Sequence, residues 1–113
     1  MRLNIVNPNT TAAMTKVIAE AAAKVARPGT TICAVESEFG PASIEGYYDD
    51  AFAVPGLLRR IAEGEAAGAA AHVIACFDDT GLDAARALAK APVVASARPH
   101  STWRASCVIG LRS

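Results

Sequence analysis

The sequence predicts an α/β fold in which helices cover both faces of a parallel sheet. Short, nearly continuous apolar runs are followed in turn by longer stretches of helical periodicity. The short runs lack the apolar–polar alternation of a strand with one face exposed to solvent. Glycine, proline or asparagine marks most of the switches between them. Because parallel neighbours need long crossover connections, this order favours successive right-handed β-α-β units in one sheet.

The elements are predicted from these runs and from the turn and helix-end residues between them. They are, in order, a strand at 2–6, a helix from 11 to the stop at 28–29, a strand at 31–35, a loop at 36–46, a helix that ends at 68, a strand at 72–76, a helix through 82–88 and a strand at 91–94. We expect Asn9 or Thr10 to cap the first helix and Pro55 to lie near the start of the second. Asp79 or Thr80 is expected to cap the third.

Composition restricts the classes of function. The 113 residues are 52% hydrophobic, which suits one compact domain. Basic and acidic residues balance at 11 each, so no basic field attracts nucleic acid or a membrane surface. The N-terminus lacks the features of a signal peptide and no apolar stretch could span a bilayer, so we expect a cytoplasmic protein. Three cysteines without a CxxC pair predict neither a disulfide framework nor a metal site.

Ligands of such sheets bind beyond the carboxyl ends of the strands, where residues 7–11, 36–43 and 76–81 should meet. Cys76 is the reactive side chain of this set. The start of the following helix would lower the pKa of its thiol, whereas the carboxylates of Asp78 and Asp79 would raise it. A packed strand cysteine explains the same position, and the residues alone favour packing over catalysis.

The segment Asn7-Pro8-Asn9-Thr10-Thr11 offers the amides of a first helical turn to an anion or a carbonyl oxygen. It lacks the glycine patterns of a P-loop or a dinucleotide site, and ordinary turn chemistry explains it equally well. Cys33 and His72 are expected to be structural. Residues 47–50, Tyr-Tyr-Asp-Asp, either line a pocket or begin a helix with acids in its first turn.

With these residues identified, the chain resembles the hydantoin racemase branch of the aspartate/glutamate racemase superfamily. Three stretches carry the resemblance and together cover about residues 2–94: RLNIVNPNTTAAMT, GPASIEGYYDDAFAVPGLLRRIAEGEAAGA and HVIACFDDTGLDAARALAKAPVV. The resemblance implies a racemase that needs no cofactor and has two similar α/β lobes, each with one catalytic cysteine. Residues 1–94 would be the N-terminal lobe.

The same resemblance implies roles for individual residues. Cys76 would be the first catalytic cysteine, which moves the C5 proton of a 5-substituted hydantoin. Two-base chemistry of this kind needs a thiolate on one face of the planar carbon and a thiol on the other. Asn9 and backbone amides would hold the carbonyl oxygens of the substrate. The expected substrate-binding residues are Asn9, Thr10, Ile44, Phe77 and Asp78.

The sequence departs from the family after Val94. Residues 95–113 read ASARPHSTWRASCVIGLRS, where family members continue into a second lobe. Cys107 lies in no matching motif, so the second catalytic role is not assigned to it. We expect an atypical tail that reflects a frameshift or truncation. Three alternatives to hydantoin racemisation remain open: allantoin racemisation, decarboxylation by a single cysteine, and a non-catalytic binding or assembly role with self-association through the surface of the missing lobe.

Overall fold

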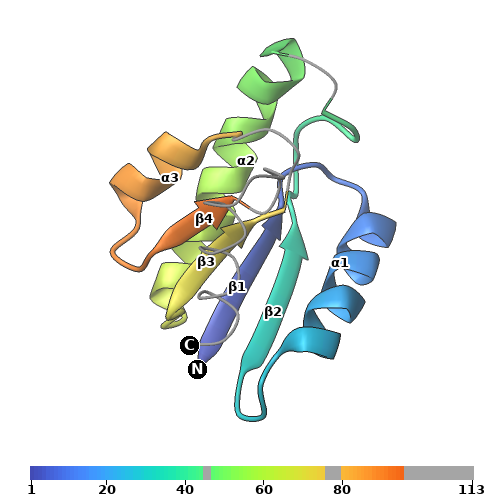
Figure 1. Cartoon of the computed structure of the whole chain (residues 1–113). Coiled ribbons are helices and arrows are strands. Elements are labelled where there is room, and N and C mark those ends of the chain that lie inside the picture. Colours follow the sequence, from blue (N-terminus) through green and yellow to red (C-terminus); the bar gives the residue numbers. More distant parts are fainter. Residues whose placement is uncertain (45–46, 76–79, 96–113) are drawn as a thin grey trace, which may run out of the picture.

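The computed structural model describes residues 1–44, 47–75 and 80–95 of the chain (Figure 1). Within these ranges the elements are β1 (Arg2–Asn7), α1 (Ala12–Val25), β2 (Thr31–Glu36), α2 (Tyr47–Ala66), β3 (Ala71–Ile74), α3 (Leu82–Leu88) and β4 (Val93–Ala95). The strands form one parallel sheet in the order β2-β1-β3-β4. The predicted α/β fold is therefore confirmed. No helix in the described part of the chain is both long and apolar enough to cross a membrane.

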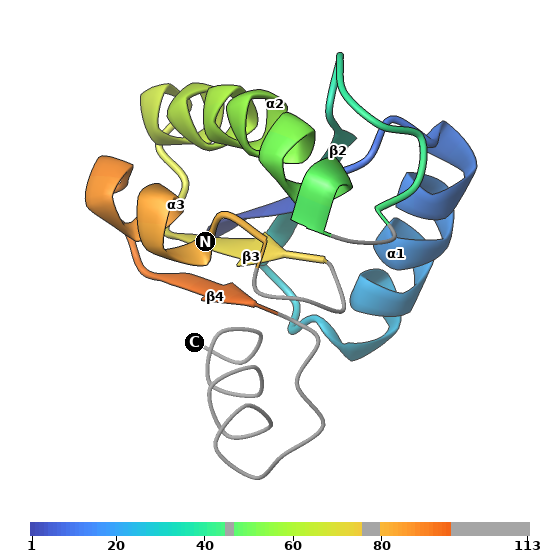
Figure 2. The same cartoon turned by 90° about the horizontal axis from the view of Figure 1, so that it is seen from above.

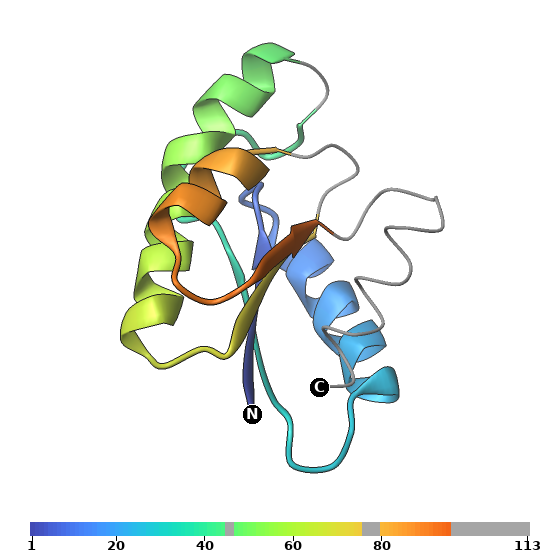
Figure 3. The same cartoon turned by 60° about the vertical axis from the view of Figure 1, so that its left-hand side comes forward.

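The sheet lies between two layers of helices. Seen from above, α2 and α3 lie on one face and α1 lies on the other (Figure 2), and the turned view shows the same separation (Figure 3). β1 is a central strand, and its last residue, Asn7, pairs with Glu36 at the end of β2. Because all neighbours are parallel, the carboxyl ends of the strands lie at the same end of the sheet, which we call the carboxyl edge. The start of α2 lies toward this end as well (Figure 1).

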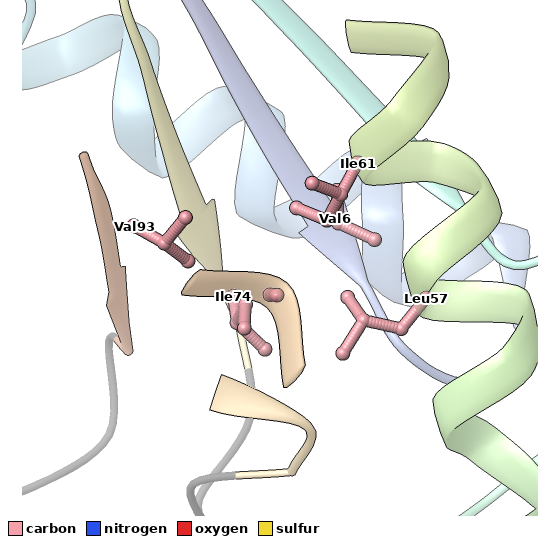
Figure 4. Packing of buried hydrophobic residues seen from close by; sticks show 6 residues of the cluster. Val6, Leu57, Ile61, Ile74 and Val93 are labelled. Carbon is pink, nitrogen blue, oxygen red and sulfur yellow. The ribbon is translucent and has the colours of Figure 1, made fainter. Parts of the chain in front are cut away.

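Both faces of β1 are buried, which explains its nearly unbroken apolar run. Val6 points to the α2 face, where six residues form one buried cluster (Figure 4): Val6, Leu57, Ile61, Ile74, Ala85 and Val93. Leu3 and Ile5 point to the α1 face and pack with Ala22 and Val73. Complete burial of a branched aliphatic side chain contributes about 1.5–3 kcal/mol. These two clusters therefore hold the layers together and fix the position of the carboxyl edge.

The cap predictions for α1 and α3 are wrong. The N-cap of α1 is Thr11, and it makes no side-chain cap bond. α3 begins after Gly81, whose φ of 66° lies in the left-handed region that favours glycine. Thr80, the expected cap, instead donates its hydroxyl to Asp50, 30 residues earlier in the chain. The other candidate, Asp79, lies outside the described residues.

The position predicted for Pro55 is also wrong. α2 begins at Tyr47, with Asp49 and Asp50 in its first turn, so Pro55 lies well inside the helix. A proline there removes one hydrogen bond, to the carbonyl of Ala51 four residues earlier. Ala51 is exposed, so water can reach that side of the helix. The missing bond therefore costs little, and the packing of α2 on the sheet outweighs the preference of proline for the first turn of a helix.

Candidate active site

Of the predicted substrate-binding residues that the structure describes, Asn9 is the most constrained. Its backbone N–H donates to Asn7 Oδ1 at 3.3 Å, and its own Oδ1 accepts from the N–H of Thr11 at 2.9 Å. These two turns carry the chain from the end of β1 to the start of α1. The side-chain nitrogen of Asn9 donates to Met14 Sδ at 3.4 Å, and a thioether is a weak acceptor. The amide nitrogen of Asn9 is therefore held in place but weakly engaged.

The end of β2 is tied to this turn through the backbone. The N–H of Ser37 donates to the carbonyl of Asn7 at 3.1 Å and to that of Asn9 at 3.0 Å. Ser37 is buried against α2, where Gly56 leaves room for it: a Cβ on Gly56 would lie 3.0 Å from Ser37 Oγ and 3.1 Å from Ser37 Cβ. The packing of α2 and the position of Asn9 are thus connected through Ser37.

Two further contacts join residues 9–11 to the loop after β2. The N–H of Thr10 donates to the carbonyl of Pro41 at 3.1 Å, and the hydroxyl of Thr11 donates to that of Ala42 at 2.7 Å. Ile44 follows two residues later and is half-buried. The structure thus brings Asn9 and Thr10 together with the loop that leads to Ile44, although these segments are about thirty residues apart in sequence.

The third segment of the carboxyl edge follows β3. The N–H of Ala75 donates to the carbonyl of Val6 at 2.9 Å, which extends the parallel pairing by one residue. Cys76 is the next residue, and it lies with Phe77 and Asp78 outside the described residues, so their predicted roles stay predictions. The next described residue is Thr80, which is 4% exposed and donates its hydroxyl to Asp50 Oδ1 at 2.7 Å.

A buried polar cluster that was not predicted from the sequence lies toward the opposite edge. His72 is fully buried at the start of β3, with Nδ1 2.9 Å from Asn4 Nδ2 and Nε2 2.6 Å from Glu65 Oε2. Asn4 Nδ2 also donates to the carbonyl of Arg60 at 3.4 Å, which fixes the orientation of the amide. His72 Nδ1 is then the acceptor, so the proton is on Nε2 and is donated to Glu65.

The Glu65 carboxylate is satisfied from three directions. Besides His72, the backbone N–H groups of Lys90 and Ala91 donate to it at 2.8 and 3.3 Å. The hydrogen bond from His72 and then that from Lys90 lower the pKa of Glu65 below its ordinary value. This cluster ties α2 and β3 to the turn before β4. The one available signal in the sequence was a polar Asn4 in the middle of an apolar run.

Among the described residues, no three histidine, cysteine, aspartate or glutamate side chains come together as metal ligands. Cys33 is half-buried within β2 and pairs with Asn4 of β1 in the sheet register. It therefore occupies a structural position, away from the carboxyl edge. The chemistry expected at that edge depends on the polar groups of residues 7–11 and on Cys76.

Comparison with known proteins agrees with this architecture. The chain is 51% identical over 94 residues to a hydantoin racemase of Pseudomonas sp. (strain NS671) and 50% identical over 94 residues to one of Rhizobium meliloti. Each match covers 83% of this chain but only 38% and 39% of the relatives. The chain thus spans less than half the length of these curated relatives.

Solved structures give the same result. An allantoin racemase from Klebsiella pneumoniae superposes with a TM-score of 0.82 at 50% identity, covering 84% of this chain and 39% of that one. An allantoin racemase from Pseudomonas fluorescens gives a TM-score of 0.79 at 35% identity, with 84% and 40% covered. The family profile described as Asp/Glu/Hydantoin racemase matches residues 3–100. By sequence and by fold, the chain belongs to the Asp/Glu/Hydantoin racemase family.

Proposed function

We propose that this chain supplies one proton-transfer site of a cofactor-independent racemase of 5-substituted hydantoins, with Cys76 as the group that moves the C5 proton. The observation that carries the proposal is the match at 50–51% identity to hydantoin racemases over 94 residues. The family match over residues 3–100 includes all three segments of the carboxyl edge. Cys76 follows directly on Ala75, the last described residue of the third segment.

The chemistry of the substrate explains why a thiol suffices. The C5 hydrogen of a hydantoin is acidified by the adjacent carbonyl, because its removal gives an enolate stabilised by delocalisation. A thiolate whose pKa lies near the working pH can accept this proton and return it. No metal or redox step is required for that exchange.

The polar groups of residues 7–11 suit the oxygen that becomes negative in this reaction. The side-chain nitrogen of Asn9 has only the Met14 thioether as a described partner and can turn from it to a substrate carbonyl at little cost. Thr10 lies next to it, just before the N-terminal end of α1, and the dipole of that helix favours negative charge there. Preorganised donors of this kind stabilise a developing oxyanion by several kcal/mol, about 2.7–4 for one donor. Ile44 contributes an apolar wall.

The extent of the chain shapes the expected activity. It spans 38–39% of the hydantoin racemases that it matches. The resemblance implies that the partner cysteine belongs to a second lobe. With one thiol on one face of C5, the proton is removed and returned on that same face. We therefore expect the 113-residue chain to exchange the C5 hydrogen with solvent and to retain the configuration.

The test uses one enantiomer of 5-benzylhydantoin in deuterated buffer. Loss of the C5–H signal is followed by NMR while optical rotation is recorded, and the rate in buffer alone is subtracted. We expect exchange without loss of rotation, and its disappearance in Cys76→Ser. Cys33→Ser is the matched control, since Cys33 lies within β2. Exchange that survives Cys76→Ser would refute the role of Cys76, and equal rates of exchange and racemisation would show a second base in the chain.

Allantoin is the second candidate substrate, since the chain is 50% identical to an allantoin racemase with a TM-score of 0.82. Allantoin is itself a hydantoin with a ureido group at C5, so the same proton transfer applies to both. The two candidates differ in the polarity of the C5 substituent. Parallel exchange assays with allantoin and 5-benzylhydantoin rank them by rate at equal concentration.

A further inference from the structure

The carboxamide of Asn9 is bound firmly at its oxygen and weakly at its nitrogen. Oδ1 accepts the N–H of Thr11 at 2.9 Å, which is an ordinary length for a bond between amide groups. Nδ2 lies 3.4 Å from Met14 Sδ, and a thioether sulfur is a weak acceptor. Asn9 is only 6% exposed. So weak an acceptor for a buried N–H is unusual, because buried polar groups in proteins are normally well hydrogen-bonded.

The main chain of Asn9 is held independently of this weak contact. Its backbone N–H donates to Asn7 Oδ1 at 3.3 Å, and its carbonyl accepts the N–H of Ser37 at 3.0 Å. Together with the bond from Thr11 to Oδ1, these contacts come from β1, from the start of α1 and from the loop after β2. The side-chain nitrogen can therefore change its acceptor while the rest of Asn9 stays in place.

The position of Met14 would favour a stronger acceptor than the one it carries. Met14 is the third residue of α1 and is 46% exposed, and the first turn of this helix contains no acidic residue. Glutamate or glutamine is preferred at this place after a threonine N-cap, and the helix dipole favours negative charge there. Either residue would also satisfy the N–H of Asn9. A thioether instead leaves that N–H easy to displace.

We infer that Met14 is a positioning residue for the proposed proton transfer: its thioether holds the Asn9 side-chain N–H in the free chain and releases it to the substrate oxygen that becomes negative. This inference rests on the proposed role of Asn9 and assigns Met14 no contact with the substrate. A charged oxygen is a much stronger acceptor than a neutral sulfur, so the N–H turns to it as charge develops.

Two substitutions at this position should have opposite effects on stability and on rate. Met14→Leu leaves a buried N–H without an acceptor, so the Tm should fall by at least about 3 °C. Its kcat/KM for C5 exchange should be the same as in the parent chain or up to about threefold higher, because no bond has to be broken. Met14→Gln supplies an amide oxygen, so the Tm should not fall. Its kcat/KM should decrease roughly three- to tenfold, which corresponds to one net hydrogen bond that competes with the substrate.

The matched control is Val17→Gln. It places the same side chain one turn further along α1, where Val17 is 65% exposed. Its Tm and kcat/KM should equal those of the parent chain, which separates the effect on Asn9 from that of a polar group on this helix. Thermal unfolding followed by circular dichroism gives the Tm and shows that each variant folds.

NMR of the ¹⁵N-labelled chain gives a readout that does not depend on catalysis. The side-chain NH₂ signals of Asn9 are assigned by their loss in Asn9→Ser, which keeps an oxygen to accept the N–H of Thr11. They should move downfield in Met14→Gln and upfield in Met14→Leu, following the strength of the acceptor. The side-chain signals of Asn4 should not move, because Asn4 binds His72 toward the opposite edge of the sheet.

The outcomes distinguish failure of the inference from failure of the proposed function. Asn9 signals at the same place in the parent chain and both Met14 variants overturn the inference. Equal losses of kcat/KM in Met14→Leu and Met14→Gln also overturn it, because packing is then the cause, and so does an unchanged rate in Met14→Gln with shifted Asn9 signals. Absence of any Cys76-dependent C5 exchange in the parent chain refutes the proposed function, and the role of Met14 falls with it.

Discussion

Gly64→Ala tests whether the buried polar cluster requires a close approach of α2 to the sheet. A Cβ on Gly64 would lie 2.8 Å from Asn4 Cγ and 3.0 Å from His72 Cε1. Both neighbours are buried and hydrogen-bonded to each other, so neither can move without loss of the Asn4–His72 bond. Alanine in place of glycine inside a helix would otherwise stabilise it by about 1 kcal/mol.

The expected magnitude follows from these opposing terms. Overpacking of a filled core costs about 1–3 kcal/mol, and a buried polar group left without its partner costs a further 1–3 kcal/mol. After the helical gain of about 1 kcal/mol is subtracted, Gly64→Ala should lower the free energy of unfolding by roughly 1–5 kcal/mol, with about 3 kcal/mol at the centre of the range. In a domain of this size the Tm should then fall by roughly 10 °C.

Urea unfolding followed by circular dichroism measures the effect, with the parent chain, Gly64→Ala, Asn4→Ala and the double variant analysed as a cycle. If contact with Asn4 is the cause, Gly64→Ala should cost less than about 1 kcal/mol in the Asn4→Ala background. Ala62→Gly, an exposed position of the same helix, calibrates the propensity term. A Gly64→Ala chain that is as stable as the parent would refute the close approach.

Three more predictions address the core, the cluster and the exposed apolar side chains. The pKa of Glu65 in the folded chain lies below its ordinary value of 4.5, so the ionised carboxylate contributes its full stabilisation above pH 4.5 and loses it as the pH falls through the folded-state pKa. In urea unfolding between pH 3 and 7, the free energy of unfolding should therefore fall less steeply toward acid pH in Glu65→Gln than in the parent chain. Leu57→Ala should cost about 2–5 kcal/mol, against less than 1 for the half-exposed Leu88→Ala. Tyr48 and Phe52 are 76% and 55% exposed with ring centroids 4.9 Å apart, and together they form an exposed aromatic pair. Because such a pair favours self-association, the chain should elute above monomer mass in size-exclusion chromatography, and the double variant Tyr48→Ser/Phe52→Ser should elute as a monomer. Unchanged elution of the double variant would contradict self-association through this pair.

The α/β fold was predictable because both faces of the sheet are covered. Burial on two sides requires apolar strands without alternation, and the run that includes Leu3, Ile5 and Val6 satisfies this requirement within one short segment. The strand ends were less accurate: the run at 72–76 indicated a strand there, whereas β3 spans Ala71–Ile74. A run of apolar residues shows where a strand exists, but pairing with its neighbours decides where it ends.

The parts of the site that the sequence missed depend on contacts between distant residues. Thr80 looked like a helix cap because local rules favour threonine before a helix, yet its hydroxyl bonds to Asp50 of α2. His72 was expected to be structural and is buried, but its partners Asn4 and Glu65 could not be identified from spacing. The loop at residues 7–11 was placed correctly, since strand-end loops of a parallel sheet meet at one edge. The role of Cys76 stays a prediction.

β1 shows how one strand serves stability and chemistry at once. Asn4 and Asn7 are both buried, but they are three residues apart and therefore point to opposite faces. Asn4 engages the cluster with His72 on the α2 face, far from the carboxyl edge. Asn7 donates to the carbonyl of Thr11 and to Thr15 Oγ1 of α1, each at 3.3 Å, and accepts from the N–H of Asn9. Each amide is costly to bury unless fully bonded. The Asn7 bonds hold the turn that presents Asn9, so the residue that most disturbs the apolar pattern at the end of β1 is also the one that builds the proposed oxyanion site.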